Sequence, residues 1–168
     1  MDDESVYQGD SKSKGIDFFI KKEFNRHSAW VSYSLSKTEE YFPYFEDDIY
    51  RRALHDQRHE VKLAGIFNIR PFYISANYVY GSGFPDPSPL LSDDLFEQAY
   101  SRLDAAVIYR FSRNRYSLET GLSVLNVFNR ENIKYSNFVR VPTNLTGTVN
   151  IHAEAVPRTL TVFLNMSF

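Results

Sequence analysis

Two groups of side chains in this sequence have types that could bind a metal ion. His55 and His59 are four residues apart. On a strand that spacing places both on one face about 13 Å apart, from ~3.3 Å per residue, which is too far for one ion. The carboxylate pairs Asp47-Asp48 and Asp93-Asp94 could help to hold calcium, although such pairs in loops are more often solvated charges. We therefore expect a positional role for the histidines and predict neither a metal site nor a cofactor.

The sequence also lacks the patterns of nucleophilic or phosphate chemistry. No serine stands in a Gly-x-Ser-x-Gly elbow, and no histidine is flanked by a recognisable triad partner. The glycines of the segment Gly81–Pro89 are followed by no lysine, so this segment is not a phosphate loop. It is typical of a strand that leaves a sheet into a loop. We predict that the protein is not an enzyme.

The best candidate for ligand contact is the loop Glu39–Asp48, which mixes aromatic and acidic side chains. Aromatic loop residues can stack on sugars or bury part of a ligand. The alternative is a loop that packs against its own neighbours. The candidate contact residues are Tyr41, Phe42, Tyr44 and Phe45.

Composition narrows the class of protein. The 168 residues are enough for one domain or part of one. A net charge of -2 gives no broad basic surface, so we expect no nucleic-acid partner. The absence of cysteine excludes disulfides and thiolate metal sites from these residues. An aromatic content of 16% suits a membrane barrel with aromatic girdles at both interfaces.

Period-two alternation is the strongest structural signal. It predicts an all-β chain, and no helical periodicity of useful length competes with it. The stretch 8–14 has the composition of a loop. Seven strands are expected, at Gly15–Phe24, Ala29–Thr38, Gln57–Ile69, Phe72–Gly81, Arg102–Phe111, Tyr116–Val127 and Arg158–Phe168.

The connections between these strands alternate between tight and long. Residues 25–28, 70–71 and 112–115 form tight connections, and residues 39–56, 82–101 and 128–157 form connections of 18 to 30 residues. Bacterial outer-membrane barrels have short periplasmic turns and long extracellular loops. The alternation therefore predicts an antiparallel transmembrane β-barrel segment. Six charged residues should face its interior: Glu60, Lys62, Arg102, Asp104, Arg110 and Glu119.

Aromatic residues fall near both ends of the expected strands. Two rims are predicted from them, one towards the long loops and one towards the tight turns. The first comprises Tyr33, Tyr41, Phe42, Tyr44, Tyr78, Tyr80 and Phe84, and the second Phe24, Phe72, Phe111, Tyr116 and Phe168.

Several short motifs together resemble the carboxy-terminal part of a TonB-dependent receptor, the large outer-membrane transporter of Gram-negative bacteria. The order and spacing of these motifs make the resemblance specific, and they are most similar to receptors of Bacteroidetes-type bacteria. The resemblance covers nearly all of residues 1–168. The motifs are Gly15-Ile-Asp-Phe18, Asp56-Gln-Arg-His59, Tyr80-Gly-Ser-Gly-Phe-Pro85, Ser101-Arg-Leu-Asp104, Val124-Leu-Asn-Val-Phe-Asn-Arg130 and Phe168.

The resemblance implies a 22-stranded barrel with a plug domain inside it, and ligand uptake driven by TonB. Neither the plug nor the TonB box is found in this sequence, and seven is an odd strand count. We expect a truncated gene or fragment, with roughly fifteen strands and the plug missing upstream. TonB would act only through that missing part. The amino terminus has no signal-peptide features, so either the protein is cytosolic or the sequence is the downstream part of a longer precursor.

The terminal strand carries a second implication of the family. Its alternating apolar residues and final aromatic resemble the end that the barrel-assembly machinery recognises. These residues are Leu160, Val162, Leu164, Met166 and Phe168.

The sequence thus predicts an integral protein of the Gram-negative outer membrane that contacts lipid and serves uptake of a small ligand. The ligand itself is not encoded in any recognisable motif. Two alternatives stay open: a complete eight-stranded outer-membrane barrel, as in an adhesin or structural protein, and a soluble all-β binding domain.

Overall fold

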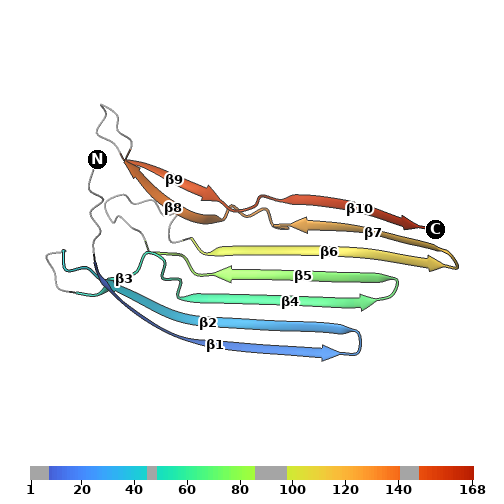
Figure 1. The fold of residues 1–168 in the computed structure, drawn as a ribbon, viewed down its shortest axis with the longest axis horizontal. Helices are drawn as coiled ribbons and strands as arrows, with labels where there is room; N and C mark the ends of the chain where they lie inside the picture. The colour runs from blue at the N-terminus through green and yellow to red at the C-terminus, as the bar shows by residue number, and fades with distance from the viewer. Residues whose placement is uncertain (1–7, 45–48, 86–97, 141–147) are drawn as a thin grey trace.

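The computed structural model describes residues 8–44, 49–85, 98–140 and 148–168. Ten β-strands lie in these ranges, and no helix does (Figure 1). The strands are β1 (Asp10–Phe24), β2 (His27–Tyr41), β3 (Arg51–Arg52), β4 (His59–Ile69), β5 (Phe72–Gly81), β6 (Tyr100–Arg113), β7 (Tyr116–Leu125), β8 (Ile133–Arg140), β9 (Thr148–Glu154) and β10 (Thr159–Ser167). No described segment is therefore a helix able to cross a membrane.

Eight of the strands form one open antiparallel sheet. Its order is β1-β2-β4-β5-β6-β7-β10, and the short β3 pairs with the carboxy-terminal end of β2. The strands β8 and β9 form a separate hairpin. Strands β1 and β10 are the two edges, and the sheet does not close on itself.

The seven predicted strands are confirmed as the seven strands of this path, with shifted ends. The expected loop at residues 8–14 is wrong from Asp10 onward, because β1 begins there and pairs Asp10 with Tyr41. Its serines and lysines are held by β2, so a non-local partner overrides their weak strand propensity. The long connection at 128–157 also contains β8 and β9, which were not predicted. In the sequence of β8, Asn137 interrupts the apolar alternation.

Two of the tight turns depend on asparagine. Asn25, between β1 and β2, has a φ of 54°, and Asn114, between β6 and β7, has a φ of 55°. A left-handed backbone is costly for most side chains, and asparagine tolerates it better than other residues with a Cβ. Next to each turn the pairing is continuous: all of β1 pairs with β2, and Ala105–Arg113 of β6 pairs with Tyr116–Val124 of β7.

The sheet is a single layer without a hydrophobic core. Among the described residues, Ala53 in the β3–β4 connection is the one buried apolar side chain. Globular domains bury the apolar face of a sheet against a second layer. Here that face is uncovered, and the described part of the chain supplies nothing to cover it.

Candidate functional site

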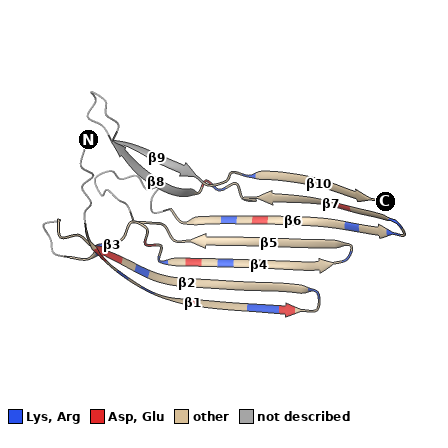
Figure 2. Ribbon diagram, viewed as in Figure 1, with Lys and Arg blue, Asp and Glu red and all other residues tan. Residues whose placement is uncertain are grey.

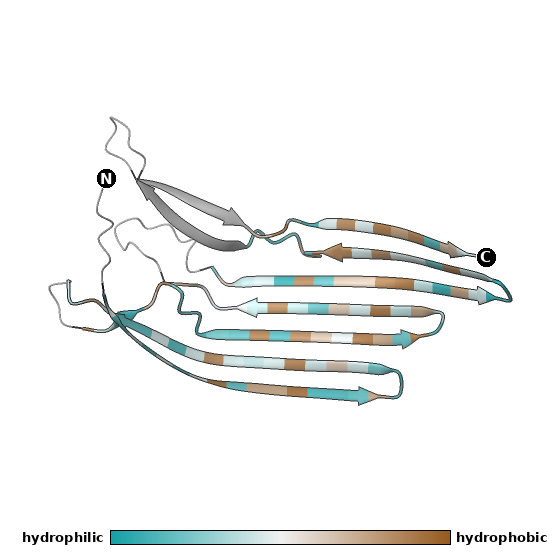
Figure 3. Cartoon of the chain, viewed as in Figure 1, coloured by the Kyte–Doolittle hydropathy of each residue, from teal (hydrophilic) through white to brown (hydrophobic). Residues whose placement is uncertain are grey.

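The cross-strand register sorts the side chains of the main sheet onto two faces. One face, called the apolar face below, has aliphatic and aromatic residues on every strand. Figure 3 shows hydrophobic residues alternating with more hydrophilic ones along the strands. It comprises Ile16, Phe18 and Ile20 of β1; Val31, Tyr33 and Leu35 of β2; Val61, Leu63, Phe67 and Ile69 of β4; Phe72, Ile74, Tyr78 and Tyr80 of β5; Leu103, Val107, Tyr109 and Phe111 of β6; Leu118, Leu122 and Val124 of β7; and Leu160, Val162, Leu164 and Met166 of β10.

The apolar face is both uncharged and exposed. Between the first and last residues named on each strand, it carries no Asp, Glu, Lys or Arg. Its side chains are open to the surroundings: Ile20 is 67% exposed, Val162 65% and Ile69 56%. An apolar surface that spans a whole sheet is far larger than the isolated patches of soluble monomers.

From β4 to β10 the apolar stretch shifts along the sheet by an average of one residue per strand step, with no shift between β4 and β5. It is centred on Gly65 in β4 (Val61–Ile69) and on Leu164 in β10 when Phe168, just beyond that strand, is included (Leu160–Phe168). The residues directly opposite Gly65 on successive strands are Ala76, Ala105, Val124 and Leu160. The centre therefore moves four residues over four strand steps. One residue of ~3.3 Å per step of ~4.8 Å corresponds to a tilt of about 35° between the strands and the normal to the band.

The height of the band follows from the same geometry. Val61 to Ile69 spans about 26 Å along the strand, from ~3.3 Å per residue. Projected through about 35°, that gives a band about 22 Å tall. Transmembrane barrels have an apolar band ~25 Å tall and strands tilted ~35–45°.

Aromatic residues border the band at both ends, as the sequence predicts. Tyr78 and Tyr80 lie on the apolar face towards the long connections, whereas Tyr33 lies within the apolar stretch of β2, between Val31 and Leu35. Phe72 and Phe111 lie on the same face towards the tight turns. Such residues are typical of interfacial girdles.

The opposite face, called the polar face below, carries ion pairs on β4, β6 and β7. Glu60 and Lys62 of β4 are joined at 2.7 Å. On β6, Arg102 and Asp104 are joined at 2.8 Å, and Arg110 pairs with Glu119 of β7. Figure 2 shows the β4 and β6 pairs along their strands. The prediction that these six residues share one face is confirmed.

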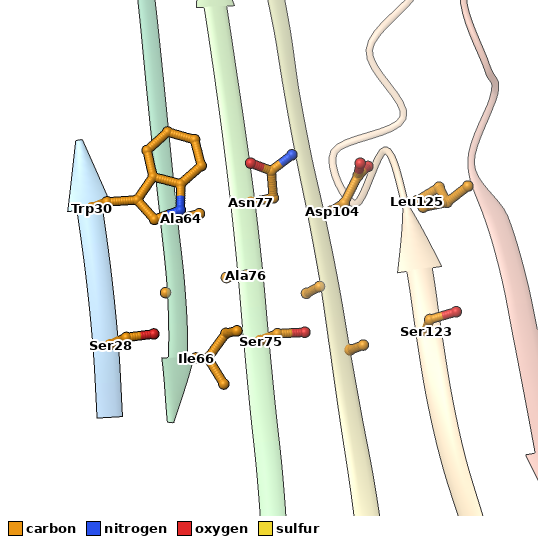
Figure 4. Close-up of a pocket in the computed structure, with 13 residues that line it drawn as sticks. Ser28, Trp30, Ala64, Ile66, Ser75, Ala76, Asn77, Asp104, Ser123 and Leu125 are labelled. Carbon is orange, nitrogen blue, oxygen red and sulfur yellow. The ribbon is translucent and has the colours of Figure 1, made fainter. Parts of the chain in front are cut away.

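Between these pairs, the polar face has a shallow hollow of about 300 Å³ (Figure 4). Trp30 of β2 forms one side, and Asn77 and Asp104 form another. Its floor is made of small side chains, including Ala64 and Ser75. The charged residue of its lining, Asp104, is already paired with Arg102.

Asp56 forms a joint at the base of the β2–β4 connection. Its buried carboxylate accepts hydrogen bonds from the backbone N–H of Thr38 at 2.7 Å, from Arg52 Nε at 2.8 Å and from Arg58 Nε at 2.5 Å. Desolvation acts to raise the pKa of Asp56, but these three donors together outweigh it and hold the pKa below its usual value. The ionised carboxylate thus ties both ends of the connection together.

Asn126 forms a second joint where the chain leaves β7. Its buried side chain donates to the carbonyls of Arg130 at 2.9 Å and Val156 at 3.2 Å, and accepts from the N–H of Arg130 at 3.1 Å. Its own N–H donates to Asp104 Oδ1 at 2.9 Å. This network fixes the exit from β7 against β6.

Comparison with known proteins adds no further identification. No protein-family model matches this chain. No curated protein and no solved structure matches it significantly. The function of the chain is therefore inferred from the geometry of the sheet and its two faces.

Three of the four aromatic loop candidates lie within the described residues. Tyr41 ends β2, and its ring lies 5.5 Å from that of Tyr50, centroid to centroid. Tyr44 is 61% exposed, and Phe42 is half-buried. Phe45 lies outside the described residues. A ligand-contact role for these four residues stays a prediction.

The metal candidates are not brought together. His55 Nδ1 lies 3.6 Å from Glu40 Oε1, and His59 Nδ1 lies 2.9 Å from the hydroxyl of Tyr33. The two histidines thus have different partners. Asp47-Asp48 and Asp93-Asp94 lie outside the described residues.

The terminal apolar residues share one face of the edge strand β10, as predicted. Leu160, Val162, Leu164 and Met166 are each more than 60% exposed there, and Phe168 is 91% exposed just beyond the strand. Their role in assembly stays a prediction. The motifs that contain Asp56 and Asn126 could be recognised in the sequence. The burial and the hydrogen bonds of these two side chains could not.

Proposed function

We propose that this chain forms part of the wall of a transmembrane β-barrel in the Gram-negative outer membrane, in a transporter of the TonB-dependent receptor type. The single observation that carries the proposal is the tilted apolar band on a sheet that has no core. Lipid would cover this band, and the polar face would line the interior. The transporter would take up a ligand with energy supplied through TonB by a part of the receptor outside these residues.

Two arguments favour lipid over a second protein layer as the covering for the apolar face. A tall uncharged band bordered by aromatic rims matches the cross-section of a bilayer, with its two interfaces. A shift of one residue per strand is also the stagger that closed barrels require, since barrel strands tilt by ~35–45°. A flat layer packed on this sheet would have no need of that stagger.

The direction of the two edge strands favours a large barrel over closure of this sheet by itself. Six antiparallel steps separate β1 from β10, so the two edges run in the same direction (Figure 1). Antiparallel closure between them needs an odd number of additional strands. Further strands of a larger barrel would supply them and satisfy the unpaired edges.

The polar face fits the interior of such a receptor. Its ion pairs and its serine and asparagine side chains can stay hydrated or contact a domain inside the barrel. The joints at Asp56 and Asn126 would hold the long extracellular connections in fixed positions at the mouth, where a ligand is first met.

Thiol labelling in cells tests the location and orientation. His55→Cys places a thiol in a long connection, and Arg115→Cys places one in a tight turn. A membrane-impermeant maleimide should label His55→Cys on intact cells. It should label Arg115→Cys only after the outer membrane is permeabilised. Equal labelling of both on intact cells, or of neither, would contradict the proposal.

Three further measurements separate the alternatives. The 168-residue chain refolded alone in detergent should not show heat-modifiable migration, whereas a complete eight-stranded barrel would. A soluble binding domain would stay monodisperse without detergent. Finally, the periplasmic domain of TonB should retain the full-length receptor on a column, and failure to retain it would argue for a structural barrel.

A further inference from the structure

Two lysines lie directly opposite each other at one border of the apolar face. Lys14 of β1 pairs with Lys37 of β2, one row beyond the apolar pair Ile16 and Leu35. Because residues two apart on a strand share a face, both ammonium groups rise from the same side as the apolar band. Like charges placed directly opposite on neighbouring strands are destabilising unless an anion lies between them.

The surrounding charges only partly relieve this repulsion. Glu39 lies 2.5 Å from Lys37, and the ammonium of Lys12 lies over the ring of Tyr50 at 3.6 Å. Among the described residues, Lys14 has no ion-pair partner, and it is exposed. At this border of the face, Asp10 and Glu39 offset two of the three lysines Lys12, Lys14 and Lys37, so one positive charge remains. The row nearest the band is purely cationic.

The position of the pair points to the kind of anion. It lies at the end of β1 and β2 that carries a long connection, where Tyr41 and Tyr50 also lie. In the proposed orientation this is the outer leaflet, at the level of the headgroups. Lysine side chains can lay their aliphatic stems along acyl chains and raise the ammonium group to the interface.

We infer that Lys14 and Lys37, assisted by Lys12, bind a phosphate of an anionic glycolipid in the outer leaflet. The two facing ammonium groups would hold one phosphate between them, while Ile16 and Leu35 contact the acyl chains below. This inference rests on the proposed membrane location. It adds a specific lipid partner at one place on the barrel rim.

The test uses the full-length protein from outer membranes and vesicles of phosphatidylcholine with a fixed fraction of lipid A. Replacing both lysines, as Lys14→Gln with Lys37→Gln, should weaken binding of the protein to lipid A about thirtyfold, on the order of fivefold for each lysine. The control is Lys22→Gln, on the same strand and face but beyond the other end of the apolar stretch. It should leave the affinity unchanged. Lys14→Arg with Lys37→Arg should retain binding.

Several results would overturn the inference. One is equal affinity of the wild-type and double-Gln proteins for lipid A. Another is an equal loss for Lys22→Gln. Displacement of lipid A by equimolar inorganic phosphate would show that a free anion, not a lipid, is the ligand. If the double-Gln protein fails to fold, the double-Arg protein decides the question. It keeps both positive charges, so its failure to bind lipid A would contradict phosphate binding. Absence of the wild-type protein from outer membranes would instead refute the proposed function.

Discussion

Replacing Val107 by arginine should be far more harmful than the same change at the adjacent Ala106. Val107 is the midpoint of the apolar stretch Leu103–Phe111 of β6, and lies between Ile74 and Leu122 of the neighbouring strands. An arginine on the lipid face at the bilayer midplane costs ~2–4 kcal/mol. With ~1.4 kcal/mol per tenfold change, the folding equilibrium should fall by about 30- to 700-fold.

Ala106 provides the matched control. It lies on the polar face between Ser75 and Ser123, on the floor of the hollow. An arginine there can stay hydrated, so the free energy of unfolding should change by no more than ~0.5 kcal/mol, as for most surface substitutions. The assay is refolding of the full-length protein into lipid vesicles over a urea series, with heat-modifiable migration as the readout of the folded fraction. Equal costs at the two positions, or a greater cost at Ala106, would refute the assignment of the faces.

Three further predictions concern the joints and the sheet. Asp56→Asn should lower the free energy of unfolding by ~1.5–3 kcal/mol, because Arg52 and Arg58 lose a charged acceptor. Because the folded-state pKa of Asp56 is lowered, the stability that Asp56 contributes should be complete above its unfolded pKa of ~3.9 and lost as pH falls through the lower folded pKa. Limited proteolysis of the β2–β4 connection at a series of pH values measures this loss. Protease resistance that does not change with pH would contradict the role of Asp56. Asn126→Ala should cost ~1–3 kcal/mol, because it leaves the carbonyls of Arg130 and Val156 without this donor; unchanged protease resistance after β7 would contradict this. Gly121→Val should cost ~1–3 kcal/mol, because even a Cβ at Gly121 would lie 2.3 Å from the Phe163 ring; a urea midpoint equal to that of the wild-type protein would show that the ring moves freely aside.

The strands and their faces could be predicted because the signal for each is local. In β4, for example, Leu63 and Phe67 fall on one face and Lys62 on the other by period-two alternation alone. The beginning of β1 could not be predicted in this way. Its serines and lysines are in a strand only because β2 pairs with them.

The joints and the tilt of the band depend on contacts between distant residues. The role of Asp56 requires Thr38, eighteen residues earlier, and that of Asn126 requires Val156, thirty residues later. The tilt depends on the registers of consecutive strand pairs. The alternation in the sequence predicts the faces of each strand but not these registers. The facing of Lys14 and Lys37 follows from the same kind of register.

Spin-label accessibility along β6 tests the central claim most directly. The chain contains no cysteine, so a single cysteine can be placed at each position from Leu103 to Phe111 and carry a nitroxide. In outer membranes, odd-numbered positions should collide readily with oxygen and little with a water-soluble nickel chelate. Even-numbered positions should do the reverse. Uniform accessibility to the chelate at both sets of positions would contradict a lipid-facing apolar band.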